Sequence, residues 1–499
     1  MSENDGKIHI KLERHKWPDE VAEIERQKKE KRSKLVTVIL IVIAFMLGWL
    51  GNNVLYFMNS KDEYNPTEVK IEAIWSILNN NWYFGVVDED REENIINRML
   101  YGMTTSEEDP HTTYMSSEEI EAFTQSINMN YSGIGVQFFQ SEGISMVEKV
   151  FANSPADQAG VLPGDVFYEV DGVLVEDKTS TELSDMVKGV EGTPVTIVFD
   201  RQGELVEVTI VRADLNATCY GEMLTDTIGY LELYQFGEDT AYEVETYVGL
   251  MKNQGMKDLI INLRDNGGGY LGTVVDIASK FLPKNSVVLK QEYPNGTVQE
   301  NLTKEGYIEG IGKIVVLINE NTASASEVLT LALSEQRDNV TIVGTTSYGK
   351  GTVQTTTVFK DNSALKYTTS KWLSSKDAWV NGVGITPDIV VEVPDVMKTV
   401  YLDFGEEEVY SLDSVSEANK QIQLALQFLG YDVARTDGYF DESFKVALEK
   451  FEKEKEFDIT GTLNQKNYTS ILSQVQRAWN LDKKYDNQLQ KAIEVINYG

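Results

Sequence analysis

The chain has 499 residues, with 45 Lys and Arg against 79 Asp and Glu, and its formal net charge at pH 7 is −34. This length exceeds that of one ordinary domain, so we expect three or four. So acidic a chain lacks the basic surface that nucleic acid requires, and we predict no nucleic-acid partner. Cys219 is the only cysteine, which excludes an intrachain disulfide and a cysteine zinc site.

Residues 35–58 form the first predicted element, because they are predominantly apolar and about 20 apolar residues span a bilayer as a helix. The basic stretch "KKEKRSK" lies directly before them. The positive-inside rule therefore predicts a cytoplasmic tail at 1–34, a single-pass anchor in the cell membrane at 35–58, and an extracytoplasmic remainder. A cleaved signal peptide is the alternative, but the long charged start and the lack of a small-residue cleavage site disfavour it.

The rest of the chain divides by pattern. Helical spacing of apolar residues dominates at first, short strands and glycine turns follow, and strand-like and helix-like runs then alternate as in an α/β layer. The prediction is a multidomain α/β protein. Its parts are a helical segment at 59–130, a β-domain at 131–213, an α/β core at 214–402, an acidic linker at 403–417, a small helical domain at 418–476 and a helical tail at 477–499.

Two glycine-bearing blocks characterise the predicted β-domain: "YSGIGV" at 131–136 and "NSPADQAGVLPGDVFYEVDG" at 153–172. Together they resemble a PDZ domain, in which a peptide C-terminus pairs as an added strand while loop amides hold its carboxylate. The resemblance implies a carboxylate-binding loop at Ser132, Gly133, Ile134 and Gly135. An ordinary glycine-rich β-domain is the alternative.

A second glycine-rich loop, "INLRDNGGGYLG" at 261–272, joins a strand-like run to a helix-like one. Free backbone amides in such a loop can hold an oxygen anion. Many strand-to-helix turns carry glycines, so this loop acquires weight only from the blocks that follow it.

The stretch "NENTASASEV" at 319–328 places Ser324 between a buried strand-like run and a helix-like run. The amide of Ala325 falls in the first helical turn, where amides lack an intrahelical partner and the helix dipole is positive. A lone serine at this position is more often an N-cap than a nucleophile, and Thr322 and Ser326 are similar distractors.

A base is offered by "TTSYGKGTVQ" at 345–354, where Lys350 lies between two glycines. A lysine can take a proton from serine if burial lowers its pKa from about 10.4 towards neutrality, and Ser–Lys pairs are a known variant of hydroxyl-plus-base catalysis. Gln354 could orient the amine without adding charge. A solvated loop lysine is the alternative. His111 is the only histidine after the predicted span, and we interpret it as a structural loop residue.

The order of these blocks over about residues 65–395 resembles that of the C-terminal processing (tail-specific) serine peptidases. The resemblance implies Ser324 as nucleophile, Lys350 as general base and Gln354 as the residue that orients the base. It also implies an oxyanion hole made by the amides of Ala325 and Gly268, with Gly269 as the alternative to Gly268, and neither a metal nor an organic cofactor.

Three departures from the family pattern stand out. "DNGGG" has glycine where proline is usual, so the contributing glycine of 267–269 stays open. The interval from the serine to the lysine is one residue longer, and "TTSKWLSSKDAWVNGVG" is a looser version of its block. None removes a reacting group.

The domain at 418–476, with "LQFLGY", "DGYFDE" and "ITGTLN" in order, resembles the small peptidoglycan-binding domain, and a helical dimerisation module is the alternative.

Taken together, these patterns predict a membrane-anchored, outward-facing serine endopeptidase that acts on proteins or peptides with free C-termini and associates with peptidoglycan. A catalytically idle scaffold and a latent peptidase that needs a partner are the competing hypotheses. The substrate and any homo-oligomer stay open.

Overall fold

The computed structural model describes residues 66–83 and 90–498 apart from 142, 403 and 406, together with positions 23, 26 and 29. It divides into two compact units, residues 1–99 and residues 100–499. The predicted membrane span at 35–58 lies outside the described residues. Within the part that is described, no helix has the length and apolar character needed to cross a bilayer.

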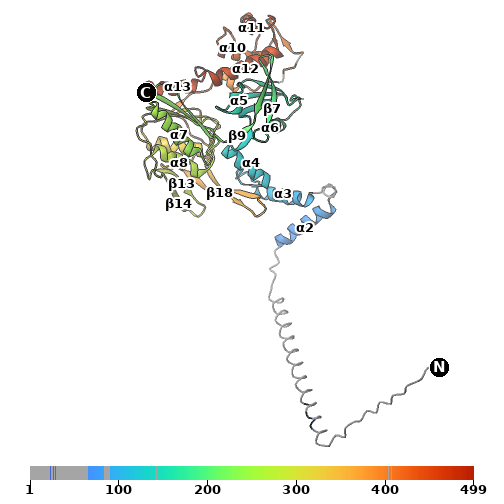
Figure 1. Cartoon of the computed structure of the whole chain (residues 1–499), viewed down its shortest axis with the longest axis vertical. Helices are drawn as coiled ribbons and strands as arrows, with labels where there is room; N and C mark the ends of the chain where they lie inside the picture. Colours follow the sequence, from blue (N-terminus) through green and yellow to red (C-terminus); the bar gives the residue numbers. More distant parts are fainter. Residues whose placement is uncertain are drawn as a thin grey trace, which may run out of the picture. The chain divides into compact units, whose positions relative to one another are not determined.

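The described residues of the predicted helical segment form three helices, the first two drawn in blue and the third in cyan in Figure 1. Ser116 and Glu119 form a reciprocal capping box at the start of the third one, which explains where it begins. A short strand precedes that helix and was not expected from the sequence. The elements are α2 (Pro66–Asn81), α3 (Arg91–Thr104), β1 (Thr113–Met115) and α4 (Ser117–Asn128).

The predicted β-domain is a sheet in the order β3-β4-β5-β7-β8, with β6 on β5 and a separate β2–β9 pair. Side chains along β7 alternate between buried and less buried positions, as a strand with one face on a core requires. Its elements are β2 (Tyr131–Gly133), β3 (Val136–Ser141), β4 (Ile144–Val150), α5 (Pro155–Gln158), β5 (Val166–Val170), β6 (Val173–Leu174), α6 (Ser180–Val187), β7 (Pro194–Arg201), β8 (Glu204–Val211) and β9 (Ala213–Leu215).

The α/β core confirms the predicted alternation. Its main sheet has the order β10-β11-β12-β15-β16-β19 and is parallel except for β10. All five residues of β15 are buried, because a central parallel strand is covered on both faces. The elements are β10 (Cys219–Met223), β11 (Ile228–Leu233), α7 (Thr240–Asn253), β12 (Asp258–Asn262), α8 (Leu271–Phe281), β15 (Ile314–Ile318), α9 (Ala325–Gln336), β16 (Val340–Gly344) and β19 (Ile389–Val390).

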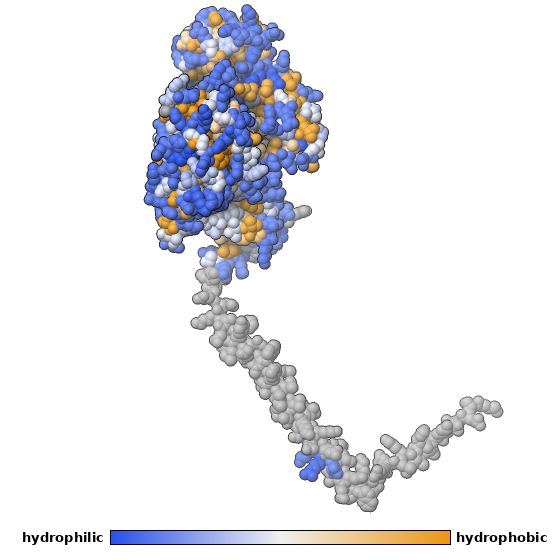
Figure 2. Space-filling view, turned by 60° about the vertical axis from the view of Figure 1, so that its left-hand side comes forward, coloured by the Kyte–Doolittle hydropathy of each residue, from blue (hydrophilic) through white to orange (hydrophobic). Residues whose placement is uncertain are grey.

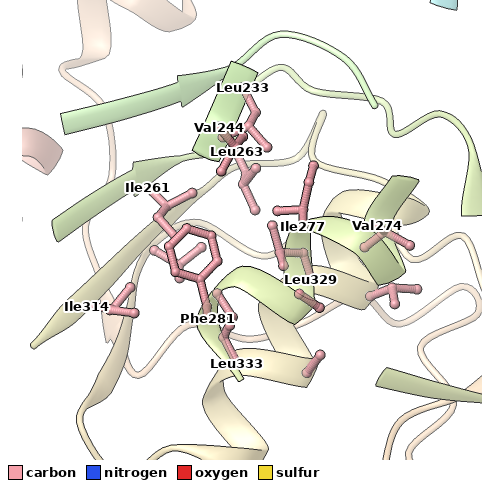
Figure 3. Close-up of a cluster of buried hydrophobic side chains, with 14 of the residues drawn as sticks. Leu233, Val244, Ile261, Leu263, Val274, Ile277, Phe281, Ile314, Leu329 and Leu333 are labelled. Atoms are coloured by element: carbon pink, nitrogen blue, oxygen red, sulfur yellow. The ribbon is translucent and has the colours of Figure 1, made fainter. Parts of the chain in front are cut away.

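One face of this sheet packs against α7, α8 and α9 in a cluster that includes Ile261, Phe281 and Leu329 (Figure 3). A second sheet, in the order β1-β18-β13-β14 with β17 on β18, stands beside it in the same unit. These strands are β13 (Val287–Glu292), β14 (Val298–Leu302), β17 (Thr352–Val358) and β18 (Ala364–Leu373).

The other face of the main sheet is covered by the C-terminal helix α13 (Asn487–Tyr498), which lies beside the core in Figure 1. Leu489, Ala492 and Ile496 pack there against Tyr230 and Val315. The last residues therefore complete the α/β core, although the sequence had suggested only a packing tail.

The small helical domain has its own core, which includes Ile422, Phe444 and Tyr468. It contacts the β-domain, where Ser473 Oγ donates to the Gly164 carbonyl at 2.5 Å. Its elements and those leading into it are η1 (Asp395–Lys398), β20 (Val409–Tyr410), α10 (Glu417–Phe428), α11 (Glu442–Glu454), β21 (Leu463–Asn464) and α12 (Gln465–Leu481). On the face shown in Figure 2, hydrophilic residues cover most of the described surface and apolar residues form smaller separate patches.

Candidate active site

Ser324 lies at the turn between β15 and α9, with φ 57° and ψ −116°. A non-glycine residue with positive φ costs about 1–3 kcal/mol and persists only where its surroundings impose it. Here the Ser324 amide donates to Glu327 Oε2 at 2.9 Å. The strained turn thus presents the serine at the start of the helix.

The two neighbouring hydroxyls have other partners. Thr322 Oγ1 donates to the Leu263 carbonyl at 2.8 Å, and Ser326 Oγ donates to the Asn266 carbonyl at 3.0 Å. Both side chains are fully buried. They fasten the serine turn to the glycine-rich loop, whereas Ser324 faces a cavity.

Gly268 lies against the start of α9. Its φ is 104°, and a Cβ at this position would lie 2.9 Å from the Ala325 nitrogen. The Gly268 amide donates to Asn266 Oδ1 at 2.9 Å, so it is engaged within the loop. In the described part of the chain, the amides of Gly269 and Ala325 have no recorded hydrogen bond. The amides of Ala325 and Gly269, two residues that line the same cavity as Ser324, are therefore available as donors.

Glu327 holds the serine turn and the lysine loop together. Its fully buried carboxylate accepts from the amides of Ser324 and Lys350, both at 2.9 Å. It also accepts from Ser347 Oγ at 2.6 Å and from the Gly349 amide at 2.8 Å. The sequence reasoning passed over this residue. The signal that could have found it is the Ser-x-x-Glu spacing of a capping box.

Lys350 is partly buried, and burial lowers the pKa of its ammonium. The positive charge of Lys366 lowers that pKa further, while the Glu327 carboxylate opposes both effects. Its carbonyl accepts from Trp372 Nε1 at 2.7 Å, which fixes the loop on β18. The lysine is therefore shifted in the direction that a general base requires.

Gln354 lies on β17, and two hydrogen bonds hold its side chain. Its Nε2 donates to Thr352 Oγ1 at 2.9 Å and to Thr368 Oγ1 at 3.1 Å. Among the described residues, no hydrogen bond joins it to Lys350. Its role as the residue that orients the base stays a prediction.

A cavity of about 330 Å³ brings these groups together. Apolar side chains, uncharged polar side chains and two lysines line it, without an Asp or Glu. Lys366, which the sequence reasoning did not single out, is held over the Phe123 ring at 4.6 Å from its centroid. The lining residues are Phe123, Ile127, Gln235, Gly267, Gly268, Gly269, Tyr270, Leu271, Ser324, Ala325, Val328, Lys350, Thr352, Val353, Gln354, Thr356, Lys366 and Trp372.

The predicted carboxylate-binding loop of the β-domain is not part of this cavity. Ser132 and Gly133 pair with β9, and the carbonyls of Ile134 and Gly135 accept from amides of the same domain. In the described structure, Ser132 Oγ is buried without a hydrogen-bond partner. The loop thus offers one unused polar atom.

His111 lies close enough to the lysines to respond to their charge. Burial lowers the pKa of its imidazole, and the positive charges of Lys350 and Lys366 lower it further, against the opposing Asp109. It does not line the cavity. Its interpretation as a structural loop residue stays a prediction.

Three protein-family models match parts of the chain. The peptidase family S41 model matches residues 227–391, a PDZ domain model matches 146–201, and a peptidoglycan binding domain model matches 416–471. The chain carries a family S41 domain and is a serine-type peptidase. The expected resemblance to the C-terminal processing peptidases, with a PDZ domain and a peptidoglycan-binding domain, is confirmed.

Several relatives of this peptidase match along most of its length. The carboxy-terminal processing protease CtpA of Bacillus subtilis is 29% identical over 473 residues, which cover 94% of this chain and 99% of that protein. A CtpA-like serine protease of Staphylococcus aureus is 28% identical over 466 residues, covering 93% and 90%. A solved structure of the photosystem II D1 C-terminal processing protease is 22% identical, with a TM-score of 0.41, over 63% of this chain and 88% of that one.

Proposed function

We propose that this peptidase cleaves peptide bonds by a Ser–Lys mechanism in substrates whose C-terminal tails dock on its PDZ domain. The observation that carries the proposal is that one cavity collects Ser324, Lys350, Gln354 and the glycine loop from separate segments. The shared carboxylate of Glu327 fixes two of these segments to each other.

In this mechanism the neutral amine of Lys350 takes the hydroxyl proton as Ser324 Oγ attacks the substrate carbonyl carbon. The oxyanion accepts from the amides of Ala325 and Gly269. Each such donor contributes about 3–4 kcal/mol to transition-state stabilisation in other hydrolases. The lysine ammonium then protonates the leaving amine, and water hydrolyses the acyl-enzyme with the lysine again acting as base.

Tail recognition would use the free edge of β3 and the loop at 132–135. β3 is the terminal strand of its sheet, so an extended peptide can add beside it. The same domain contacts the α/β core, because Lys149 pairs with Glu232 at 2.8 Å. Glu232 also accepts from Asn262, near the start of the glycine-rich loop. A bound tail would therefore lie on a domain that is already joined to the core.

The test uses the full chain, purified in mild detergent, with casein and with peptides that end in apolar residues as either free acids or amides. Wild type should cleave, and should prefer the free acids. Ser324→Ala and Lys350→Ala should not cleave, whereas Lys360→Ala, an exposed lysine on the β17–β18 turn, should match wild type. Equal cleavage by all variants would exclude the mechanism, and equal cleavage of acids and amides would exclude tail recognition.

The membrane part of the proposal has its support in the apolar run at 35–58 and its basic flank. A single helix there would leave residues 1–34 in the cytoplasm and the peptidase outside the cell, where residues 418–476 can meet peptidoglycan. Intact cells carrying Glu20→Cys or Glu204→Cys in a Cys219→Ser chain would be treated with an impermeant maleimide. Labelling at position 204 and not at position 20 is the expected result. Labelling at position 20 and not at 204 would show that the chain has the opposite orientation.

A latent peptidase is the second candidate, favoured by the Gly268 amide that Asn266 occupies. An enzyme that uses Gly268 as an oxyanion donor must first break this hydrogen bond. Activity that rises when a non-cleavable tail peptide is added would favour latency over constitutive cleavage.

A further inference from the structure

A short turn ahead of β1 lies against the strand that faces Gln354, although it is far outside the residues that match the peptidase model. β1 pairs antiparallel with β18, Thr113 opposite Lys366. Further along β18, the Thr368 amide donates to Thr112 Oγ1 at 3.0 Å, and the Thr368 hydroxyl donates to Asp109 Oδ1 at 3.0 Å. The turn at 109–112 is thus fastened to the middle of β18.

The carboxylate of Asp109 is the acceptor at the centre of this turn. Thr112 Oγ1 donates to Oδ2 at 2.6 Å, and the His111 amide donates to Oδ1 at 3.2 Å. Burial raises the pKa of Asp109, but the hydroxyls of Thr112 and Thr368 together with the amide and charge of His111 lower it by more, so the net pKa lies below the ordinary value. The group is therefore ionised at neutral pH and can only accept hydrogen bonds.

This charge fixes the direction of the next hydrogen bond. Thr368 has one hydroxyl proton, and Asp109 takes it. The Thr368 oxygen can then only accept from Gln354, whose Nε2 lies 3.1 Å away. Nε2 also donates to Thr352 Oγ1 at 2.9 Å. Both amide protons are used, so the carbonyl oxygen of Gln354 is the group left for the cavity.

The orientation of that amide matters to a lysine base. A carbonyl oxygen accepts from the N–H groups of Lys350 and leaves the nitrogen lone pair for the serine proton. An amide turned the other way would direct its own N–H groups at that lone pair and compete with the serine. The hydrogen bond from Thr368 to Asp109 thus determines which end of the Gln354 amide is available to Lys350.

We propose that Asp109 is a positioning residue for the peptidase reaction. Through Thr368 it holds the Gln354 side chain with its oxygen towards Lys350. The inference rests on the proposed Ser–Lys function and adds to it an acidic residue from the segment before the PDZ domain.

The test measures kcat and KM of the full chain on a cleavable peptide. Asp109→Asn supplies an amide that can donate to Thr368 and so permits Gln354 to flip, while Thr368→Val removes the relay. Each should lower kcat about 10- to 100-fold with KM little changed, as expected for a misplaced catalytic group. Thr368→Ser keeps the hydroxyl and should stay within about twofold of wild type. Thr369→Val, on the same strand, is the matched control.

A second set repeats Asp109→Asn and Thr368→Val in a Gln354→Ala chain, and uses the rate of labelling by a fluorophosphonate if turnover is too slow. No further loss in that background is the expected result, because the relay acts only through Gln354. An equal loss in both backgrounds would overturn the inference, and so would wild-type kcat in Asp109→Asn or in Gln354→Ala.

If Asp109→Asn does not fold, judged by circular dichroism, the Thr368→Val and Thr368→Ser pair decides alone. Two other outcomes separate this inference from the proposed function. If Ser324→Ala cleaves as well as wild type, the Ser–Lys function fails and the relay fails with it. If wild type is active, Ser324→Ala is dead and Gln354→Ala is fully active, only the relay is overturned.

Discussion

Two fully buried glutamates in different parts of the molecule have nearly the same surroundings. Glu327 in the α/β core and Glu452 in the small helical domain each accept four hydrogen bonds. Glu452 holds the loop at Thr460 and Gly461 and the side chain of Asn467. Both carboxylates join segments that would otherwise separate.

The difference lies in what those segments carry. The segments around Glu327 present Ser324 and Lys350 to a cavity, whereas the donors to Glu452 belong to a loop and a helix that do not line it. The same structural device therefore supports chemistry at one place and folding at the other. A buried charge alone does not indicate a site, because the groups that it positions must also face a space where a substrate fits.

The strongest way to break this comparison is Glu327→Ala. It leaves two buried and two partly buried donors without their acceptor, which should lower the free energy of unfolding by about 3–5 kcal/mol. The serine turn and the lysine loop also lose their common anchor, so kcat should fall at least about 100-fold. Peptide turnover and guanidinium unfolding measure the two effects. Normal turnover in a folded variant would mean that Glu327 is as purely structural as Glu452.

A glycine pair tests the wall of the cavity. In Gly268→Ala the new Cβ would lie 2.9 Å from the Ala325 nitrogen at a φ of 104°, so the oxyanion donors must move. We expect kcat to fall about 100- to 1,000-fold, the loss typical of a missing oxyanion donor. Gly267→Ala is the control, since a Cβ there meets nothing within 4 Å. Similar kcat values for the two variants would contradict the placement of this loop.

The charge around the base predicts a pH effect of smaller size. Lys350 must be neutral to act, so kcat/KM should rise as pH increases through its pKa, which burial and Lys366 lower. Lys366→Met removes a like charge, raises the pKa of Lys350 and moves the acid limb of the profile to higher pH. Lys360→Met changes the charge equally at an exposed position and should leave the limb in place. If the acid limb does not move in Lys366→Met, the charge of Lys366 does not affect the pKa of Lys350.

The smallest expected effect on catalysis belongs to Glu452→Ala. Removing this acceptor should destabilise the small helical domain by about 3–5 kcal/mol, which limited proteolysis or denaturant unfolding would detect. Peptide turnover should be unchanged, because the residues it holds do not line the cavity. A fall in kcat comparable to that of Glu327→Ala would show that the helical domain supports the site, and the contrast between the two glutamates would fail.

Local sequence patterns were sufficient to predict many of the elements of this molecule. Alternating apolar runs predicted the strands and helices of the α/β core, and the blocks around Ser324, Lys350 and the glycine loop were recognisable in short windows. The same windows left Gly268 and Gly269 open and could not show that the Gly268 amide is already engaged by Asn266. They also could not place α13 on the core sheet.

The sequence by itself determined the order of the domains and the family, because glycine turns, a strand-to-helix serine and a lysine between glycines are local features that leave a local trace. Only the tertiary structure decided how these groups are held. Glu327 binds backbone groups 23 residues away, Asp109 contacts a hydroxyl 259 residues away, and α13 covers strands formed far earlier in the chain. Such contacts depend on which surfaces meet in the folded chain, and no short stretch of residues records that.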